Sequence, residues 1–181
     1  MTSPNFLRYA GWAAMLSAVM SLLTVITGIL MFTLSPFFGG LSDVFSVLTL
    51  GFMILVALAL YFLLRSQAPV LSLAAAVIGI LSMVLYGILQ ALLAARVLTY
   101  EQVSLPNIIT SGGIGIWLLL ANYALLRGRV FPRGSAWAGL ITGAGFLVLA
   151  LGFAIYPIWA VWLGRWLLET PQGELQVGRP G

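Results

Sequence analysis

The side chains best suited to chemistry are two carboxylates and a phenol, those of Asp43, Glu101 and Tyr100, each near the end of a hydrophobic segment. Such groups can act as general acids and bases when a substrate lies within reach. They have no nucleophile or metal-binding motif beside them in the sequence. A carboxylate at the start of a helix is stabilised by the free N–H groups and the helix dipole, which accounts for Asp43. We therefore expect no catalytic residue and no enzymatic activity.

Missing residue types exclude several further classes of chemistry. The sequence contains no Cys, no His and no Lys. Without them there is no thiolate or imidazole metal ligand, no thiol nucleophile, no histidine base and no Schiff-base lysine. The acids that remain are Asp43, Glu101, Glu169 and Glu174. We expect no metal site and no cofactor, although a bound lipid or quinone is compatible with this inventory.

The composition is that of an integral membrane protein. Of the 181 residues, 62% are hydrophobic and 7% are charged, whereas soluble domains average about 45–50% and 25%. With this hydropathy, the net charge of +4 indicates orientation in a membrane rather than binding to nucleic acid. We expect a single transmembrane domain over residues 1–168 and a polar tail over residues 169–181.

Five segments are apolar over the roughly 20 residues that a membrane span requires. They are residues 6–32, 43–64, 69–95, 106–126 and 135–156. The first is too long for the apolar part of a cleaved signal peptide. The predicted fold is therefore an all-α integral membrane protein with five transmembrane helices in a compact bundle.

A tryptophan-rich segment, residues 157–168, follows the fifth span. Pro157 offers a break there, because proline removes a helix hydrogen bond and clashes with the preceding turn. Trp159, Trp162 and Trp166 are spaced i, i+3 and i+7, which places them on one face of a helix. Since tryptophan prefers the headgroup level, we expect this segment to lie at the membrane interface.

Two segments of the chain repeat each other. Residues 59–65 and 121–127 share five identities in seven, and a proline and a serine follow each at similar offsets. The repeating unit would be a helical hairpin, spans 2–3 and spans 4–5, in parallel orientation. The alternative to a duplication is convergence, in which similar residues anchor both helix ends at the membrane interface. Such similarity arises easily because hydrophobic helices use few residue types.

Arginines near the span ends indicate orientation. With five spans and a cytoplasmic N-terminus, the inner side holds Arg8, Arg65, Arg127, Arg129 and Arg133. The outer side holds Arg96, Arg165 and Arg179. We expect a bacterial cytoplasmic (inner) membrane protein with a cytoplasmic N-terminus and an external C-terminus.

Two sets of residues are candidate binding groups. The first set would anchor lipid headgroups at the inner side: Arg8, Trp12, Arg127, Arg129, Arg133 and Trp137. The second set would form a polar mouth with a ligand site at the outer side: Tyr86, Gln90, Asp43, Arg96, Glu101, Trp159 and Trp162. Helix capping and hydrogen bonding between helices are the alternatives for these polar groups. The GxxxG spacing of Gly139 and Gly143 favours internal helix packing over a partner helix.

Three stretches resemble a family of small bacterial multi-pass membrane proteins, a domain of unknown function with five or so helices. They are residues 8–14 (RYAGWAA), 40–47 (GLSDVFSV) and 157–165 (PIWAVWLGR). The likeness covers most of the chain, in mostly apolar motifs, and implies a compact helical membrane domain. No activity is established for that group, so no residue inherits a role.

Short loops, small-residue faces and the lack of reactive groups favour a non-enzymatic structural or accessory subunit of a larger membrane assembly. Its partners would be membrane lipids and other membrane protein subunits, without nucleic acid. The alternative is a protein that binds or carries a lipid, a quinone or another hydrophobic ligand. A transporter is less favoured, because no ionisable side chain lies near the centre of a span.

Overall fold

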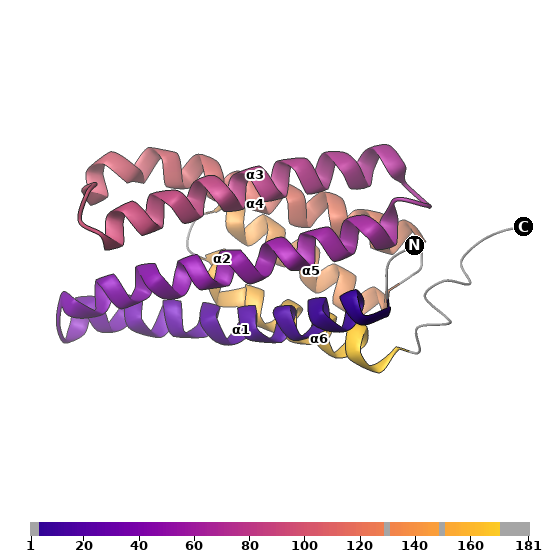
Figure 1. Cartoon of the computed structure of the whole chain (residues 1–181), viewed down its shortest axis with the longest axis horizontal. Coiled ribbons are helices and arrows are strands. Elements are labelled where there is room, and N and C mark those ends of the chain that lie inside the picture. Colours follow the sequence, from indigo (N-terminus) through magenta and orange to yellow (C-terminus); the bar gives the residue numbers. More distant parts are fainter. Residues whose placement is uncertain (1–3, 129–130, 149–150, 171–181) are drawn as a thin grey trace, which may run out of the picture.

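A computed structural model describes residues 4–128, 131–148 and 151–170. These residues form six helices and no strand (Figure 1). The helices are α1 (Pro4–Thr33), α2 (Phe37–Leu64), α3 (Pro69–Ala94), α4 (Tyr100–Gly128), α5 (Arg133–Leu147) and α6 (Leu151–Glu169). All but α5 are long and apolar enough to cross a membrane, which makes five candidate spans. The predicted all-α multi-pass membrane fold is confirmed.

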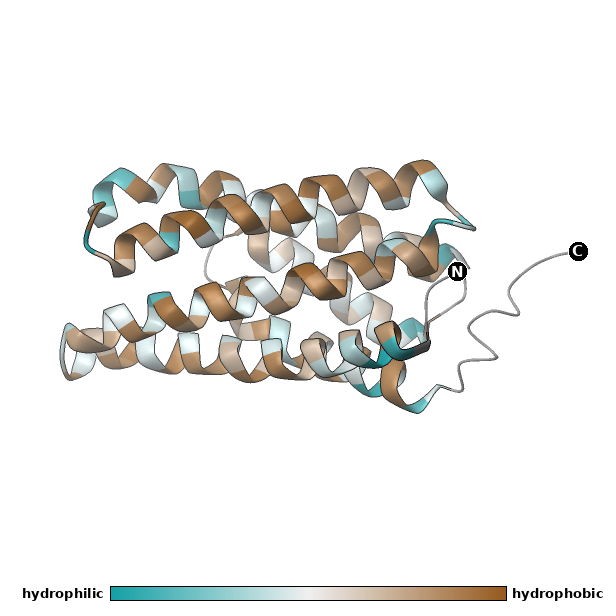
Figure 2. Ribbon diagram, in the orientation of Figure 1, coloured by the Kyte–Doolittle hydropathy of each residue, from teal (hydrophilic) through white to brown (hydrophobic). Residues whose placement is uncertain are grey.

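The helices pack in a ring in which each contacts its neighbours in the chain and α6 closes against α1. Apolar side chains run along the length of the helices, and the polar residues gather towards their ends (Figure 2). Helix α3 begins at Pro69, where proline is favoured because the first helical N–H has no partner. The start of α4 has a side-chain cap, since the Thr99 N–H donates to Gln102 Oε1 at 2.9 Å.

Two predicted helix starts are wrong, and both corrections move the expected first residue into the interior of a helix. Helix α2 begins at Phe37 rather than at Asp43, so Asp43 lies in the second turn and does not cap the helix. Helix α4 begins at Tyr100, which places Pro106 inside the helix instead of at its first position. We expected this helix to start at Pro106 because we did not consider Gln102 as a cap. The side chain of Gln102 accepts the backbone N–H of Thr99, three residues earlier, and so fixes the start of α4.

The fifth predicted span, residues 135–156, is also wrong in its bounds. The chain breaks between Leu147 and Leu151 into two antiparallel helices, so that α6 replaces the expected interfacial segment 157–168 and provides the fifth candidate span. Helix α5 has 15 residues, which makes it about 22 Å long. Since α3 has 26 residues, the α4–α5 hairpin is not a full copy of the α2–α3 hairpin.

Pro157 does not break α6, because another helix replaces the donor that it lacks. A proline at position 157 leaves the carbonyl of Phe153 without its i+4 N–H donor. The hydroxyl of Ser21 in α1 donates to this carbonyl oxygen at 2.8 Å. The chain therefore continues through Pro157 as helix, at a depth where an unpaired carbonyl would be costly.

The end of α5 is satisfied in a similar way. The last carbonyls of a helix have no partner within it. The Ser111 hydroxyl of α4 donates to the carbonyl of Phe146 at 3.0 Å. Phe146 also packs edge-to-face on Phe153 of α6, with ring centroids 4.9 Å apart. A helix end can thus lie inside the bundle because its neighbours supply both the hydrogen bond and the packing.

The α5–α6 hairpin enters and leaves the bundle at one end (Figure 1). We call this the amino-terminal end, since α1 begins there, and we call the end with the α1–α2 and α3–α4 connections the far end. Close packing fixes the direction of α6, because a Cβ built on Gly11 of α1 would lie 2.9 Å from Leu168 Cγ. Glu169 therefore ends α6 on the side where α1 starts. The expected external C-terminus falls in the tail over 171–181, outside the described residues, and stays a prediction.

We expect Ser21→Ala to lower the free energy of unfolding by about 1–3 kcal/mol, because it leaves the buried carbonyl of Phe153 without a donor. The loss should nearly vanish in a Pro157→Ala background, where the restored N–H of residue 157 takes over the bond. Thermal unfolding in mild detergent of the four proteins in this cycle measures the coupling. Equal losses in both backgrounds would show that the Ser21 bond does not compensate for proline.

Candidate functional site

Trp159 lies in the core and not at the membrane interface, which corrects its place in the predicted ligand site. Its side chain is fully buried, and its Nε1–H donates to Asn122 Oδ1 of α4 at 3.0 Å. Its ring meets Trp117 edge-to-face with centroids 6.2 Å apart. Trp162 is 46% exposed, while Trp166 packs on Phe131. The three tryptophans therefore do not share one environment, because Trp159 faces the core and Trp162 faces the surface of α6.

Asn122 allows the indole of Trp159 to be buried, because it accepts the indole N–H. Its Nδ2 donates to the carbonyl of Leu118 at 2.8 Å, which leaves Oδ1 free to accept from Trp159. Asn122 also packs on Gly139 of α5, where a side chain would collide with its amide. Gly143 packs against Gly115 of α4 in the same way. The GxxxG pair thus serves internal packing, as predicted.

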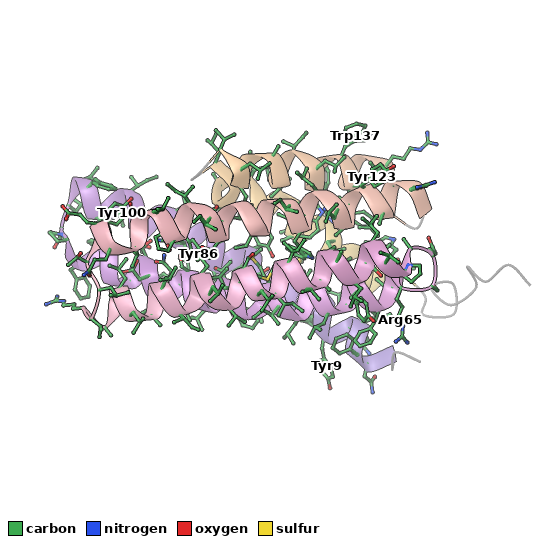
Figure 3. All side chains as sticks on the ribbon, turned by 90° about the horizontal axis from the view of Figure 1, so that it is seen from above. Tyr9, Arg65, Tyr86, Tyr100, Tyr123 and Trp137 are labelled. Carbon is green, nitrogen blue, oxygen red and sulfur yellow. The ribbon has the colours of Figure 1, made fainter. Side chains whose placement is uncertain are left out.

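A polar cluster lies inside the far end of the bundle, and we define it as Asp43, Tyr86, Gln90 and Asn107. Asp43 is half-buried, and it lies on the buried face of α2, three residues before Ser46 and seven before Leu50. Tyr86 lies in α3, and its ring packs on Phe153 of α6 with centroids 5.9 Å apart. Figure 3 shows Tyr86 and Tyr100 towards the same end of the bundle.

Gln90 is the most deeply buried member of this cluster. It is 5% exposed, and its amide makes no hydrogen bond with any other residue that the structure describes. Gln90 lies seven residues after the buried Met83 and three after Gly87, on the interior face of α3. A Cβ built on Gly87 would lie 3.8 Å from Leu50 Cδ1, which places this face opposite the Asp43 face of α2.

Asn107 completes the cluster from α4, and the sequence analysis missed it. Its Oδ1 is buried and has no hydrogen-bond partner among the described residues. Gly113 packs on Ser82, so the antiparallel register of α3 and α4 brings Asn107 to about the level of Gln90. A lone amide within an apolar helix was the available signal.

Arg96 and Glu101 lie on the surface of the far end and outside the cluster. Arg96 has φ 57° and ends α3 in a Schellman motif, with the Val97 N–H bonded to the carbonyl of Leu92. Its conformation therefore has a structural cause. Arg165, which we expected on the outer side, lies at the amino-terminal end and pairs with Glu169 at 3.2 Å.

The described members of the predicted headgroup set belong to helix segments at the amino-terminal end, where Figure 3 labels Trp137 together with Tyr9, Arg65 and Tyr123. These members are exposed: Arg8, Trp12, Arg127, Arg133 and Trp137. Arg129 lies outside the described residues. Arg8 and Trp12 line a shallow recess of about 240 Å³ together with Asn5 and Tyr9. With Arg65 and Arg165, five of the six described arginines lie at this end, and only Arg96 lies at the far end.

Comparisons of the chain with protein-family models, with curated proteins and with solved structures gave no match. The site must therefore be judged from its own chemistry. The cluster offers a carboxylate, a phenol and two amides, and the Oδ1 of Asn107 is buried without a hydrogen-bond partner among the described residues. This set can hold a polar group by hydrogen bonds and charge.

Proposed function

We propose that this protein is a non-enzymatic membrane protein that binds the polar head of a lipid or another hydrophobic ligand at the far-end polar cluster. The observation that carries the proposal is the buried Oδ1 of Asn107, which has no hydrogen-bond partner among the described residues, at about the level of Gln90, whose side chain is 5% exposed. A buried polar group without a partner costs about 1–3 kcal/mol. A ligand head that donates a hydrogen bond to Asn107 Oδ1 removes this cost.

The short α5–α6 hairpin leaves the far end of the bundle to the first four helices. The hairpin meets α4 at the Ser111 bond to Phe146 and α1 at the Ser21 bond to Phe153. From Ser21 to Thr33, α1 continues for about 18 Å. At the far end the ring therefore consists of α1 to α4 (Figure 1). Asp43 is half-exposed there, so the outer edge of the cluster is accessible.

Orientation forms part of the proposal. We place the arginine-rich amino-terminal end in the cytoplasm of a bacterial cell and the polar cluster towards the outer leaflet, following the positive-inside tendency. The exposed aromatic residues Tyr9, Trp12, Tyr123 and Trp137 at the amino-terminal end suit the headgroup level. The ligand would then come from the outer half of the inner membrane.

The test is whether the purified protein retains a lipid or quinone in a manner that depends on Gln90. We expect Gln90→Met to reduce the retained ligand severalfold and to leave the stability of ligand-free protein unchanged or higher, because the Gln90 amide has no hydrogen-bond partner among the described residues to lose. Lipid mass spectrometry and thermal unfolding in mild detergent measure the two effects. Gln67→Met, in the exposed α2–α3 connection, is the matched control and should change neither.

A loss of stability in Gln90→Met without loss of ligand would contradict the proposal, since Gln90 would then be a structural group. An accessory role in a larger membrane assembly remains the second candidate function. It is supported by small-residue packing and the short connections between helices. Stoichiometric co-purification of another membrane protein, with no retained ligand, would favour that role.

A further inference from the structure

A shallow recess on the exposed face of α1 is lined by four side chains that can donate hydrogen bonds. Its volume is about 240 Å³, and its lining residues are Asn5, Arg8, Tyr9 and Trp12. Their spacing of i, i+3, i+4 and i+7 places them on one side of the first turns of α1. The guanidinium of Arg8 and the indole of Trp12 only donate, and an amide and a phenol can also donate. The recess therefore suits an acceptor group, and the charge of Arg8 favours a negative one.

Arg8 has no counter-charge among the residues that the structure describes. Asp43 and Glu101 lie in helix segments at the far end, and Glu169 is paired with Arg165 at 3.2 Å. At the amino-terminal end, five described arginines thus accompany one glutamate, which is already paired. An anion from outside the chain is the partner that complements this end.

The recess lies at the depth of lipid headgroups. Helix α1 has 30 residues, which makes it about 45 Å long, whereas the hydrocarbon core is about 30 Å thick. The turns at its ends therefore extend beyond the core, to where lipid phosphates lie. Tyr9 and Trp12 are 68% and 56% exposed, and Figure 3 shows Tyr9 pointing away from the bundle. Both residue types are enriched at this level of a membrane.

The backbone beneath the recess is held in place by two neighbouring helices. Leu7 is buried, and Phe6 meets Phe62 of α2 edge-to-face with ring centroids 5.8 Å apart. On the side of α6, a Cβ built on Gly11 would lie 2.9 Å from Leu168 Cγ. Helix α1 thus presents the lining residues from a fixed backbone, which lowers the cost of ordering them around a ligand.

We propose that this recess binds the phosphate of an anionic phospholipid from the leaflet at the amino-terminal end, with the guanidinium of Arg8 bonding the phosphate oxygens. A guanidinium can donate two parallel hydrogen bonds to such a group, and the indole of Trp12 offers a further donor in the same recess. Among the described residues no carboxylate lines the recess, so the ammonium of a zwitterionic head finds no partner there. The site is separate from the far-end polar cluster and does not rest on the proposed function.

The test measures the lipid that the full-length protein retains after reconstitution with equal amounts of phosphatidylglycerol and phosphatidylethanolamine. Native mass spectrometry counts the bound molecules of each lipid. We expect the wild-type protein to retain phosphatidylglycerol in preference. Arg8→Gln should lower the retained phosphatidylglycerol about fivefold, which corresponds to the roughly 1 kcal/mol that one arginine contributes near an anionic membrane surface.

Arg65→Gln is the matched control, because it removes the same charge from the same end. Arg65 is exposed, but it does not line the recess, and its guanidinium lies over the ring of Phe62, 4.9 Å from the centroid. It should leave the retained phosphatidylglycerol nearly unchanged. An equal loss in Arg8→Gln and Arg65→Gln would overturn the inference, since diffuse surface charge would then hold the lipid. A loss in Gln90→Met but not in Arg8→Gln would also overturn it, because the lipid would then belong to the far-end cluster.

A second measurement uses the unmodified chain and separates the sources of the phosphate. Lysophosphatidylglycerol should displace the retained phosphatidylglycerol, whereas lysophosphatidylcholine, whose phosphate charge is balanced by its own ammonium, should not. Inorganic phosphate at the same concentration should not displace it either, because it has no apolar tail. Equal displacement by both lysolipids would overturn the preference for an anionic head. Displacement by inorganic phosphate to the same extent would overturn the assignment to a lipid.

Discussion

A cysteine placed at Glu169 is expected to be labelled from the same side of the membrane as one placed at Asn5. The reason is the α5–α6 hairpin, which returns α6 to the end where α1 begins (Figure 1). The chain contains no cysteine, so Asn5→Cys and Glu169→Cys each carry a single thiol. In intact cells a membrane-impermeant maleimide should leave both unlabelled, and it should label both after the membrane is opened.

Val97→Cys is the control for the opposite side. Val97 lies in the α3–α4 connection at the far end and is 66% exposed. The same reagent should label it in intact cells. The expected effect is all-or-none for each position. Labelling of Glu169→Cys together with Val97→Cys would contradict the hairpin path and restore opposite sides for the two helix ends.

Hydropathy was sufficient for the fold class and insufficient for the path of the chain. Five apolar segments follow directly from composition, because lipid requires every span to be hydrophobic. The break between α5 and α6 has no such signal, since the residues around it are apolar. Pro157 was the only visible break, and Ser21 cancels its effect through Phe153, which is 132 positions from Ser21 in the sequence. A contact of this kind is invisible to a local pattern.

The candidate site was predictable in part. Asp43, Tyr86 and Gln90 were expected towards one end of the bundle, and the structure places them there. Trp159 was wrongly included, because spacing alone cannot show that Asn122 accepts its indole N–H. Asn107 was missed, since only its burial makes an ordinary amide notable. Residue spacing thus predicts which side chains share a face of a helix, but it does not predict which residues of the neighbouring helices contact that face.

The crossing of α4 and α5 is the other place where a small change should have a large effect. A Cβ built on Gly115 would lie 2.7 Å from the carbonyl oxygen of Gly143. One on Gly143 would lie 2.9 Å from the carbonyl oxygen of Gly115. Both contacts are with backbone, which cannot turn aside as a side chain does. The two helices must therefore separate to admit a methyl group.

We expect Gly143→Ala and Gly115→Ala each to lower the free energy of unfolding by about 1–3 kcal/mol, as overpacking does. Gly112→Ala is the matched control in the same helix, because a Cβ there would meet nothing within 4 Å. It should be neutral or raise stability by about 0.5–1 kcal/mol, since alanine is the better helix former. Thermal unfolding in mild detergent measures all three. If the three variants behave alike, helix propensity governs these sites, and the close crossing that seats the hairpin against α4 is absent.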